Sequence, residues 1–289
     1  MFNVKDSVCI AGNPSKVCED AIGWGKDFCF VLDGASVLSK INIVDEQSDA
    51  AWFASQIKEK LCSRLEAGAP EPTDVLLSEI IGELADIYYG TAEKKGIEPP
   101  ADSPSAGIAL FRIRKGSIEF FGLGDCTGVV RKADDKVLVM KDTRLSAFDG
   151  QVLGRMAEMH RETGISVMEA REKCSDMLIE NRSRRNKDNG YWILDLSGAG
   201  IDHALTCSWP SDSIKAFFCC SDGFAQLTDV FGIYKDYAGL LEAAESADLI
   251  KLCETLFAEQ DKDPQANRFP RFKFRDDTSC LWGEPASGK

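Results

Sequence analysis

The chain has 289 residues, of which 44% are hydrophobic and only ten are proline, so it contains enough apolar material for one continuous core. Its formal net charge of −13 argues against nucleic-acid partners, because non-specific binding to nucleic acid depends on lysine and arginine side chains that neutralise phosphates. No segment approaches the roughly 20 apolar residues of a membrane helix, and the N-terminus lacks an apolar run of signal-peptide length. We therefore expect a cytoplasmic protein with no membrane partner.

The eleven cysteines are predicted to be reduced thiols. Their number is odd, no C-x-x-C pair occurs, and all stand alone except Cys219 and Cys220. Cys29 and Cys219 lie within apolar runs, where cysteine commonly fills a core.

The first half of the chain predicts a strand, two helices and then a series of strands. The apolar run at 28–32 is of strand length and ends in an Asp-Gly turn. Apolar residues at helical spacing predict amphipathic helices at about 45–65 and from Thr73, as N-cap, to about 89. From Ser105 onward, four short β-rich runs separated by turn-sized breaks predict an antiparallel meander.

The second half begins with a strongly charged region, 147–188, which is predicted to be helical. Two interpretations remain open: a flap beside an active site, or a solvated pair of surface helices. Strand-like runs follow at 191–194 and 216–220, then helices to about 257, and a last strand near 280–282. Because strands and helices come in blocks, the pattern indicates an α+β fold with layered sheets in one domain, residues 1–289.

Acidic residues recur where the predicted strands begin or end. Three apolar runs end in an aspartate in closely similar ways, and acidic pairs precede two strands. The residues are Asp33, Asp125 and Asp222, then Glu19-Asp20 and Asp276-Asp277. Any one of them could be an ordinary turn residue. Together they predict carboxylates that converge at one edge of a sheet, where their repulsion requires cations. Hard oxygen ligands suit Mg²⁺ or Mn²⁺, and two such ions can activate a water and clamp a phosphoryl group.

Several other phosphatase classes are excluded by what the sequence lacks. Only two histidines, His160 and His203, are present, too few for a histidine-rich binuclear site. No cysteine is followed by arginine at the spacing of a cysteine-loop phosphatase, and the D-x-D pair of a phosphoaspartate enzyme is missing at Asp33. The Gly-Lys pair at 25–26 lacks the first glycine of a phosphate-binding loop.

The acidic motifs occur in an order that resembles the protein phosphatase 2C (PP2C, or PPM) family of metal-dependent protein serine/threonine phosphatases. The resemblance runs from about residue 16 to 282 and includes Glu19-Asp20, Asp33-Gly34, Gly124-Asp125, Ser221-Asp222-Gly223 and Arg275-Asp276-Asp277-Thr278-Ser279. Segments at 190–192 and 202–206 are similar to a bacterial branch of the family. The resemblance implies a four-layer α-β-β-α sandwich, in which two antiparallel sheets are flanked by helix pairs.

The resemblance also implies a role for each motif residue. Asp33 would bridge two metal ions, Mg²⁺ or Mn²⁺, and hold the nucleophilic water between them. The Gly34 carbonyl would bind one of these ions, and Asp222 and Asp276 would bind the other. The implied reaction is a single-step attack on the phosphoester by the metal-bridging water, without a phosphoenzyme.

The remaining acidic residues would complete the site. Glu19 and Asp20 would support the metals directly or through waters, and Asp125 would bind a third ion, as in bacterial members. The expected substrate is a phosphoprotein, which a serine/threonine kinase could supply.

Two departures from the family pattern concern the phosphate rather than the metals. The family's D-G-H-G-G motif has Ala35 in place of the histidine proposed as general acid, so Ser36 or a metal-bound water would have to substitute. The usual phosphate-binding arginine is replaced by Ser15, and Lys16, one position away, is the candidate phosphate contact. The basic run at 182–185 could contribute from the flap, or could be a solvated charge run.

Three functional hypotheses therefore stand. The leading one is a metal-dependent phosphatase of phosphoserine and phosphothreonine in proteins. The lost histidine and arginine also allow a non-catalytic or weakly active binding module of the same fold. A phosphatase of a small phosphorylated molecule is the third.

Overall fold

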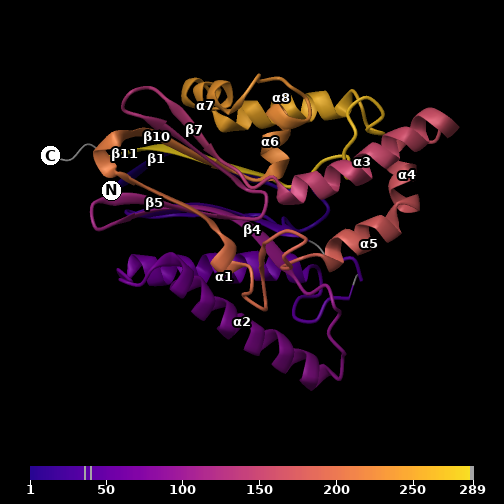
Figure 1. Ribbon diagram of the computed structural model, residues 1–289, viewed down its shortest axis with the longest axis horizontal. Helices are drawn as coiled ribbons and strands as arrows, with labels where there is room; N and C mark the ends of the chain where they lie inside the picture. The colour runs from indigo at the N-terminus through magenta and orange to yellow at the C-terminus, as the bar shows by residue number, and fades with distance from the viewer. Residues whose placement is uncertain (36, 40, 287–289) are drawn as a thin grey trace.

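The computed structural model describes residues 1–35, 37–39 and 41–286, and Figure 1 shows two sheets stacked face to face between layers of helices. Ser36, the candidate substitute proton donor, lies outside the described residues. All pairings between the named strands are antiparallel. The first sheet has the order β1 (Phe2–Ile10), β11 (Thr278–Pro285), β10 (Ile214–Cys220), β6 (Thr127–Lys132) and β7 (Val137–Met140).

The second sheet has the order β2 (Ala21–Trp24), β3 (Phe28–Ala35), β4 (Ser105–Arg114), β5 (Ser117–Leu123) and β9 (Leu205–Pro210). A two-residue strand, β8 (Leu194–Asp195), also pairs with β4. Short 3₁₀ helices at Ile201–His203 and Ser211–Ser213 flank β9.

Helices cover the outer face of each sheet. The second sheet is covered by α1 (Asp49–Glu66) and α2 (Thr73–Lys95), and the first by α6 (Asp222–Asp229), α7 (Tyr237–Ser246) and α8 (Leu249–Asp261) (Figure 1). The expected α+β fold, a four-layer α-β-β-α sandwich, is confirmed. In the part of the chain that the structure describes, no helix has the length and apolar character needed to cross a bilayer.

Strand β3 shows why the predicted run at 28–32 is apolar without interruption. Phe30 and Leu32 pack toward α1 and α2, whereas Cys29 and Val31 pack between the two sheets. Successive side chains of a strand point to opposite faces, so a strand buried on both faces needs apolar residues throughout.

Three further helices form a separate group at the end of the sandwich opposite the N-terminus (Figure 1). They are α3 (Arg144–Thr163), α4 (Val167–Lys173) and α5 (Ser175–Ser183). A small apolar cluster around Val152 and Met156, to which Ala266 and Phe272 of the segment after α8 also belong, holds them together. The helical prediction for 147–188 is thus confirmed for most of that range, with three helices in place of a pair.

The structure corrects three details of the sequence-based prediction. Thr73 is the first residue of α2, and Pro72 occupies the N-cap position. The expected meander is interrupted because β5 and β6 belong to different sheets; the chain crosses between them at Gly124, whose φ of +80° favours glycine. The run at 191–194 contributes only Leu194 to a strand. Strands β1, β2 and β9 were not predicted.

Candidate metal centre

Aspartates from both sheets meet at the end of the sandwich that carries α3–α5. Antiparallel pairing explains how they meet, because the end of one strand lies beside the start of its neighbour. In the second sheet Leu32 pairs with Ala21, which places Asp33 beside Asp20. In the first sheet the last residue of β10 pairs with Cys280, which brings Asp222 and Asp276 to the same end.

A hydrogen bond joins the two sheets at this point. The backbone N–H of Asp222, the first residue of α6, donates to Oδ2 of Asp33 over 3.2 Å. Asp125 approaches from the crossing between the sheets. Its Oδ1 would lie 2.9 Å from a Cβ placed on Gly107, the residue that pairs with Asp33. The carboxylates of Asp33 and Asp125 are therefore neighbours across strand β4.

Two glycines are required by the close approach of backbone segments around the acidic residues. A Cβ on Gly34 would lie 2.3 Å from the carbonyl oxygen of Glu19, and one on Gly223 would lie 1.9 Å from that of Asp277. Neither distance is compatible with a side chain, so glycine at these positions lets the acidic segments pack directly on one another.

Further hydrogen bonds fix the segment that carries Glu19 and Asp20. The carboxylate of Asp277 accepts from the backbone N–H of Gly12 (2.8 Å) and from that of Glu19 (2.6 Å). Ser279 Oγ donates to Oδ2 of Asp20 over 2.7 Å, and the N-cap residue of α1, Ser48, donates through Oγ to Glu19 over 2.5 Å. Asp277 therefore acts as a clamp between the N-terminal segment and β11.

The gathered carboxylates perturb one another. Burial raises the pKa of Asp20 well above the usual range, although the hydrogen bond from Ser279 lowers it. Burial, followed by the charges of neighbouring aspartates, raises the pKa of Asp33 well above that range. The same causes raise the pKa of Asp222 to about 7 and that of Asp125 to about 6. Asp222 is still exposed to solvent, which moderates the effect and leaves the group accessible.

This donor set fits divalent cations. Several carboxylates that suffer mutual repulsion are stabilised when positive charge enters among them, and oxygen donors are what Mg²⁺ and Mn²⁺ prefer. Among the described residues, no three acidic, cysteine or histidine side chains already stand at ligand spacing. A cation of the chain itself already contacts one of these carboxylates, since Lys273 Nζ lies 2.6 Å from Oδ1 of Asp276.

The sequence matches the family model described as protein phosphatase 2C over residues 13–256. The chain is a member of the protein phosphatase 2C family. The expectation of a metal-dependent phosphoprotein phosphatase with Mg²⁺ or Mn²⁺ as cofactor is confirmed at the level of this family. No curated protein sequence matches the chain.

Several solved structures share the fold of this chain. A bacterial serine phosphatase has a TM-score of 0.55 at 13% identity, with 100% of both chains covered. The serine/threonine phosphatase PstP/Ppp of Mycobacterium tuberculosis has a TM-score of 0.55 at 13% identity, with 98% of both chains covered. Stp1, a serine/threonine phosphatase of Staphylococcus aureus, has a TM-score of 0.54 at 12% identity. The match covers 100% of this chain and 96% of the Stp1 chain. At these identities the likeness shows the fold.

The residues considered for phosphate binding and proton transfer do not gather at the acidic residues as the predicted metal ligands do. Lys16 lies exposed in the turn at 13–16, and in the described part of the chain its ammonium makes no hydrogen bond or ion pair. Ala35 is the last residue of β3 and pairs with Ser105. The histidines lie elsewhere: His160 Nδ1 is 2.7 Å from the carbonyl oxygen of Ile165, and the His203 ring stacks on Trp192.

The basic run at 182–185 separates into different environments. The Arg185 side chain is only 8% exposed, forms an ion pair with Asp195 at 3.2 Å and donates to Ser103, so its role is structural. Arg184 pairs with Glu180 at the surface. Arg182 reaches toward the acidic end, where its Nη1 lies 3.4 Å from Ser105 Oγ.

Two residues of this protein phosphatase 2C site were missed in the sequence. Asp149 of α3 has a pKa raised to about 7, by burial and then by the charge of Asp222, whereas Arg182 lowers it. It therefore faces the metal ligands. Lys273 is the other; burial alone would lower the pKa of its ammonium, but the carboxylates around it raise the pKa above the ordinary lysine value. Neither residue had a distinguishing pattern, since both belong to charged segments.

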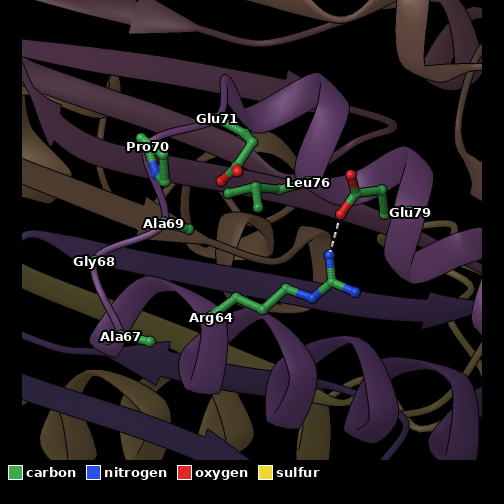
Figure 2. A pocket seen from close by; sticks show the side chains of 8 residues that line it. All are labelled: Arg64, Ala67, Gly68, Ala69, Pro70, Glu71, Leu76 and Glu79. Carbon is green, nitrogen blue, oxygen red and sulfur yellow. Dashed lines mark hydrogen bonds and ion pairs between the residues drawn. The ribbon is translucent and has the colours of Figure 1, made fainter.

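A hollow in the surface, unrelated to this site, lies at the turn between α1 and α2 (Figure 2). Arg64 and Glu79 form an ion pair across it, and it is also lined by the turn at 67–71. Ser48, which contacts Glu19, precedes the other end of α1. Because an 18-residue helix is about 27 Å long, the hollow lies far from the acidic residues.

Proposed function

We propose that this chain hydrolyses phosphoserine and phosphothreonine in proteins, with two divalent ions held by Asp33, the Gly34 carbonyl, Asp222 and Asp276. The observation that carries the proposal is the Asp222–Asp33 hydrogen bond, which brings carboxylates from the two sheets to one point. PstP, whose fold this chain shares, has been solved in complex with two manganese ions.

The remaining acidic residues have supporting roles in this proposal. Asp20 and Glu19 are held in place by Ser279 and Ser48, so they can orient waters or ligate directly. Asp125 would hold a third ion. When bound, Mg²⁺ or Mn²⁺ would supply Lewis-acid activation of a water and neutralise charge on the phosphoryl oxygens.

The protein's own contribution is geometric. The strand ends fix the carboxylates on rigid elements, and the helix group α3–α5 borders the site and would act as its flap. We place the whole chain, 1–289, in one catalytic domain. We further propose that a serine/threonine kinase generates its substrates and that it acts in the cytoplasm, where its eleven free thiols stay reduced.

A hydrolysis assay tests the proposal. The protein should release phosphate from a phosphothreonine peptide and from p-nitrophenyl phosphate only with Mn²⁺ or Mg²⁺, and chelator should abolish this. Asp33→Asn and Asp222→Asn should lose activity, whereas Asp212→Asn, an exposed residue of the short 3₁₀ helix at Ser211–Ser213, should keep it. Activity that resists chelator would contradict the metal mechanism. Metal binding without hydrolysis would favour a binding module, and turnover of small phosphoesters alone would favour a small-molecule phosphatase.

A further inference from the structure

A phosphate monoester brings as many as two negative charges to a site already crowded with aspartates. Bound metal ions offset part of this charge. The family's phosphate-binding arginine is absent, since Ser15 stands in its place, and Lys16 is turned to solvent with no contact to the acidic residues among those described. A further cation beside the metal ligands would stabilise the arriving phosphate.

The segment before Asp276 is a basic stretch in an otherwise acidic protein. Between residues 262 and 275 it holds five basic side chains and one acidic one, Asp263. The basic residues are Lys262, Arg268, Arg271, Lys273 and Arg275. This excess of positive charge directly precedes Asp276, the proposed metal ligand just before β11.

Arg271 gives this segment a fixed shape. Its side chain is only 3% exposed and donates to the Asp263 carboxylate at 3.1 Å and to the carbonyl oxygens of Phe269 at 3.0 Å and Phe274 at 3.1 Å. It also donates to the carbonyl oxygens of Gln260 and Asp263. A buried guanidinium with this many acceptors holds the chain around it in one conformation.

Arg275 anchors the other side of Lys273. It forms an ion pair with Asp261 at 2.6 Å, and its guanidinium lies over the rings of Phe257 and Phe274, at 4.8 and 5.2 Å from their centroids. Lys273 thus stands between two immobilised arginines, so the backbone that carries it is fixed relative to Asp276.

The Lys273 ammonium points at the site and is still open to it. Nζ lies 2.6 Å from Oδ1 of Asp276, which also accepts from the backbone N–H of Asp277 at 2.9 Å. The Lys273 side chain is 46% exposed. An ammonium has three N–H donors, and among the described residues Asp276 takes only one, which leaves two for phosphoryl oxygens.

We propose that Lys273 is the phosphate-contacting residue of this site and replaces the arginine that the family places at the position of Ser15. Arg271 acts as a positioning residue for it. The proposal rests on the function proposed above. A lysine offers a point charge on a flexible stem rather than a planar fork, so it tolerates a broader range of phosphate orientations.

The test compares Lys273→Met with Lys273→Arg and with Lys262→Met. Lys262 is a matched control because it is an exposed lysine of the same segment that also pairs with a carboxylate, Glu259, at 2.6 Å. Three quantities are measured for each: KM and kcat for p-nitrophenyl phosphate, the dissociation constant of inorganic phosphate for the Mg²⁺-loaded protein, and Mn²⁺ affinity from the paramagnetic signal of free Mn²⁺.

Lys273→Met should weaken phosphate binding and raise KM about tenfold, because one charge-assisted hydrogen bond is lost. Mn²⁺ affinity should stay equal or increase, since Asp276 loses a competing partner. Lys273→Arg should retain most of the phosphate affinity, and Lys262→Met should match the wild type. Unchanged phosphate binding in Lys273→Met would overturn the proposal, as would a loss confined to Mn²⁺ affinity, which would make Lys273 a support for Asp276.

The dissociation constant of inorganic phosphate separates this proposal from the proposed function. If the wild type binds phosphate but hydrolyses nothing, the effect of Lys273→Met on binding still decides the role of Lys273. If the wild type hydrolyses phosphoesters and Lys273→Met does so with unchanged KM and phosphate affinity, only the inference about Lys273 fails. If Lys16→Met weakens phosphate binding tenfold and Lys273→Met leaves it unchanged, the phosphate contact belongs to Lys16 instead.

Discussion

The backbone N–H of Asp222 donates a hydrogen bond to the carboxylate of Asp33, a residue 189 positions earlier in the chain. Asp33 belongs to a strand of one sheet, and Asp222 begins the helix that follows a strand of the other. The bond therefore lies at the seam of the sandwich, and the metal ligands of both sheets depend on how the two sheets stack.

Asp33→Asn should separate stability from function. The amide oxygen can still accept the N–H of Asp222, so the fold should survive. Removing one charge from the cluster should relieve repulsion and raise the melting temperature of the metal-free protein, while metal-dependent activity falls by about 100-fold or more. Calorimetric melting and steady-state kinetics measure both. A variant that is less stable without metal would contradict the charge-repulsion account.

Stability of the metal-free protein should decrease as pH rises from about 4 to about 7. The pKa of Asp222 is about 7 and that of Asp125 about 6 in the folded protein, because of burial and neighbouring charges, whereas an unfolded aspartate has a pKa near 3.9. The folded state therefore binds more protons in this window, and each such carboxyl lowers the free energy of unfolding by at most about 1.4 kcal/mol per pH unit, less where solvent screens it.

Urea unfolding at several pH values, with chelator present, measures this slope. Saturating Mn²⁺ should reverse it, since metal binding competes with protons for the same carboxylates. A metal-free protein whose stability increases between pH 5 and 7 would show that these aspartates are not mutually repelled.

Gly34→Ala should damage the metal site, whereas Gly82→Ala, a control on an exposed helix surface, should stabilise the protein. The added methyl at Gly34 would meet the carbonyl oxygen of Glu19 at 2.3 Å, so it should push the Glu19-Asp20 segment away and weaken Mn²⁺ binding at least about tenfold. Gly82 lies within α2 with no atom near its Cβ position, and alanine there should stabilise the protein by about 1 kcal/mol. Unchanged Mn²⁺ affinity in Gly34→Ala would refute the requirement for glycine.

Asp277→Ala should loosen the N-terminal segment. Its carboxylate accepts two backbone N–H groups, from Gly12 and Glu19, and losing two charge-assisted bonds should cost about 2–4 kcal/mol of stability. Hydrogen exchange should show faster opening at Glu19, and metal affinity should fall. Asp277→Asn keeps one acceptor oxygen, so its stability and metal affinity should lie between those of the wild type and Asp277→Ala. Protection at Glu19 that equals the wild type would argue against the clamp.

The sequence was most informative where one short motif predicted both an element of secondary structure and a functional side chain at its end. An apolar run ending in Asp-Gly predicted both strand β3 and the carboxylate at its end, and antiparallel pairing then brings the other aspartates to it. Strand β1 was missed because it is an edge strand whose polar residues, such as Asn3 and Lys5, interrupt the apolar pattern. The crossing at Gly124 was missed because a turn within a sheet and a turn between sheets use the same residues.

Lys273 and Asp149 could not be identified from the sequence for a different reason. Each lies in a charged segment whose residues are mostly solvated, so nothing in the local pattern marks the one that faces the site. Only tertiary packing distinguishes them: Arg271 orients the segment of Lys273, and the α3–α5 cluster positions Asp149.

The most direct test of the metal centre is an anomalous-difference map from crystals grown with Mn²⁺. Two manganese peaks are expected in contact with Asp33, one of them also in contact with Asp222 and Asp276, together with weaker density beside Asp125. Peaks that avoid Asp33 and Asp222, or an empty map there at saturating Mn²⁺, would contradict the proposed metal centre.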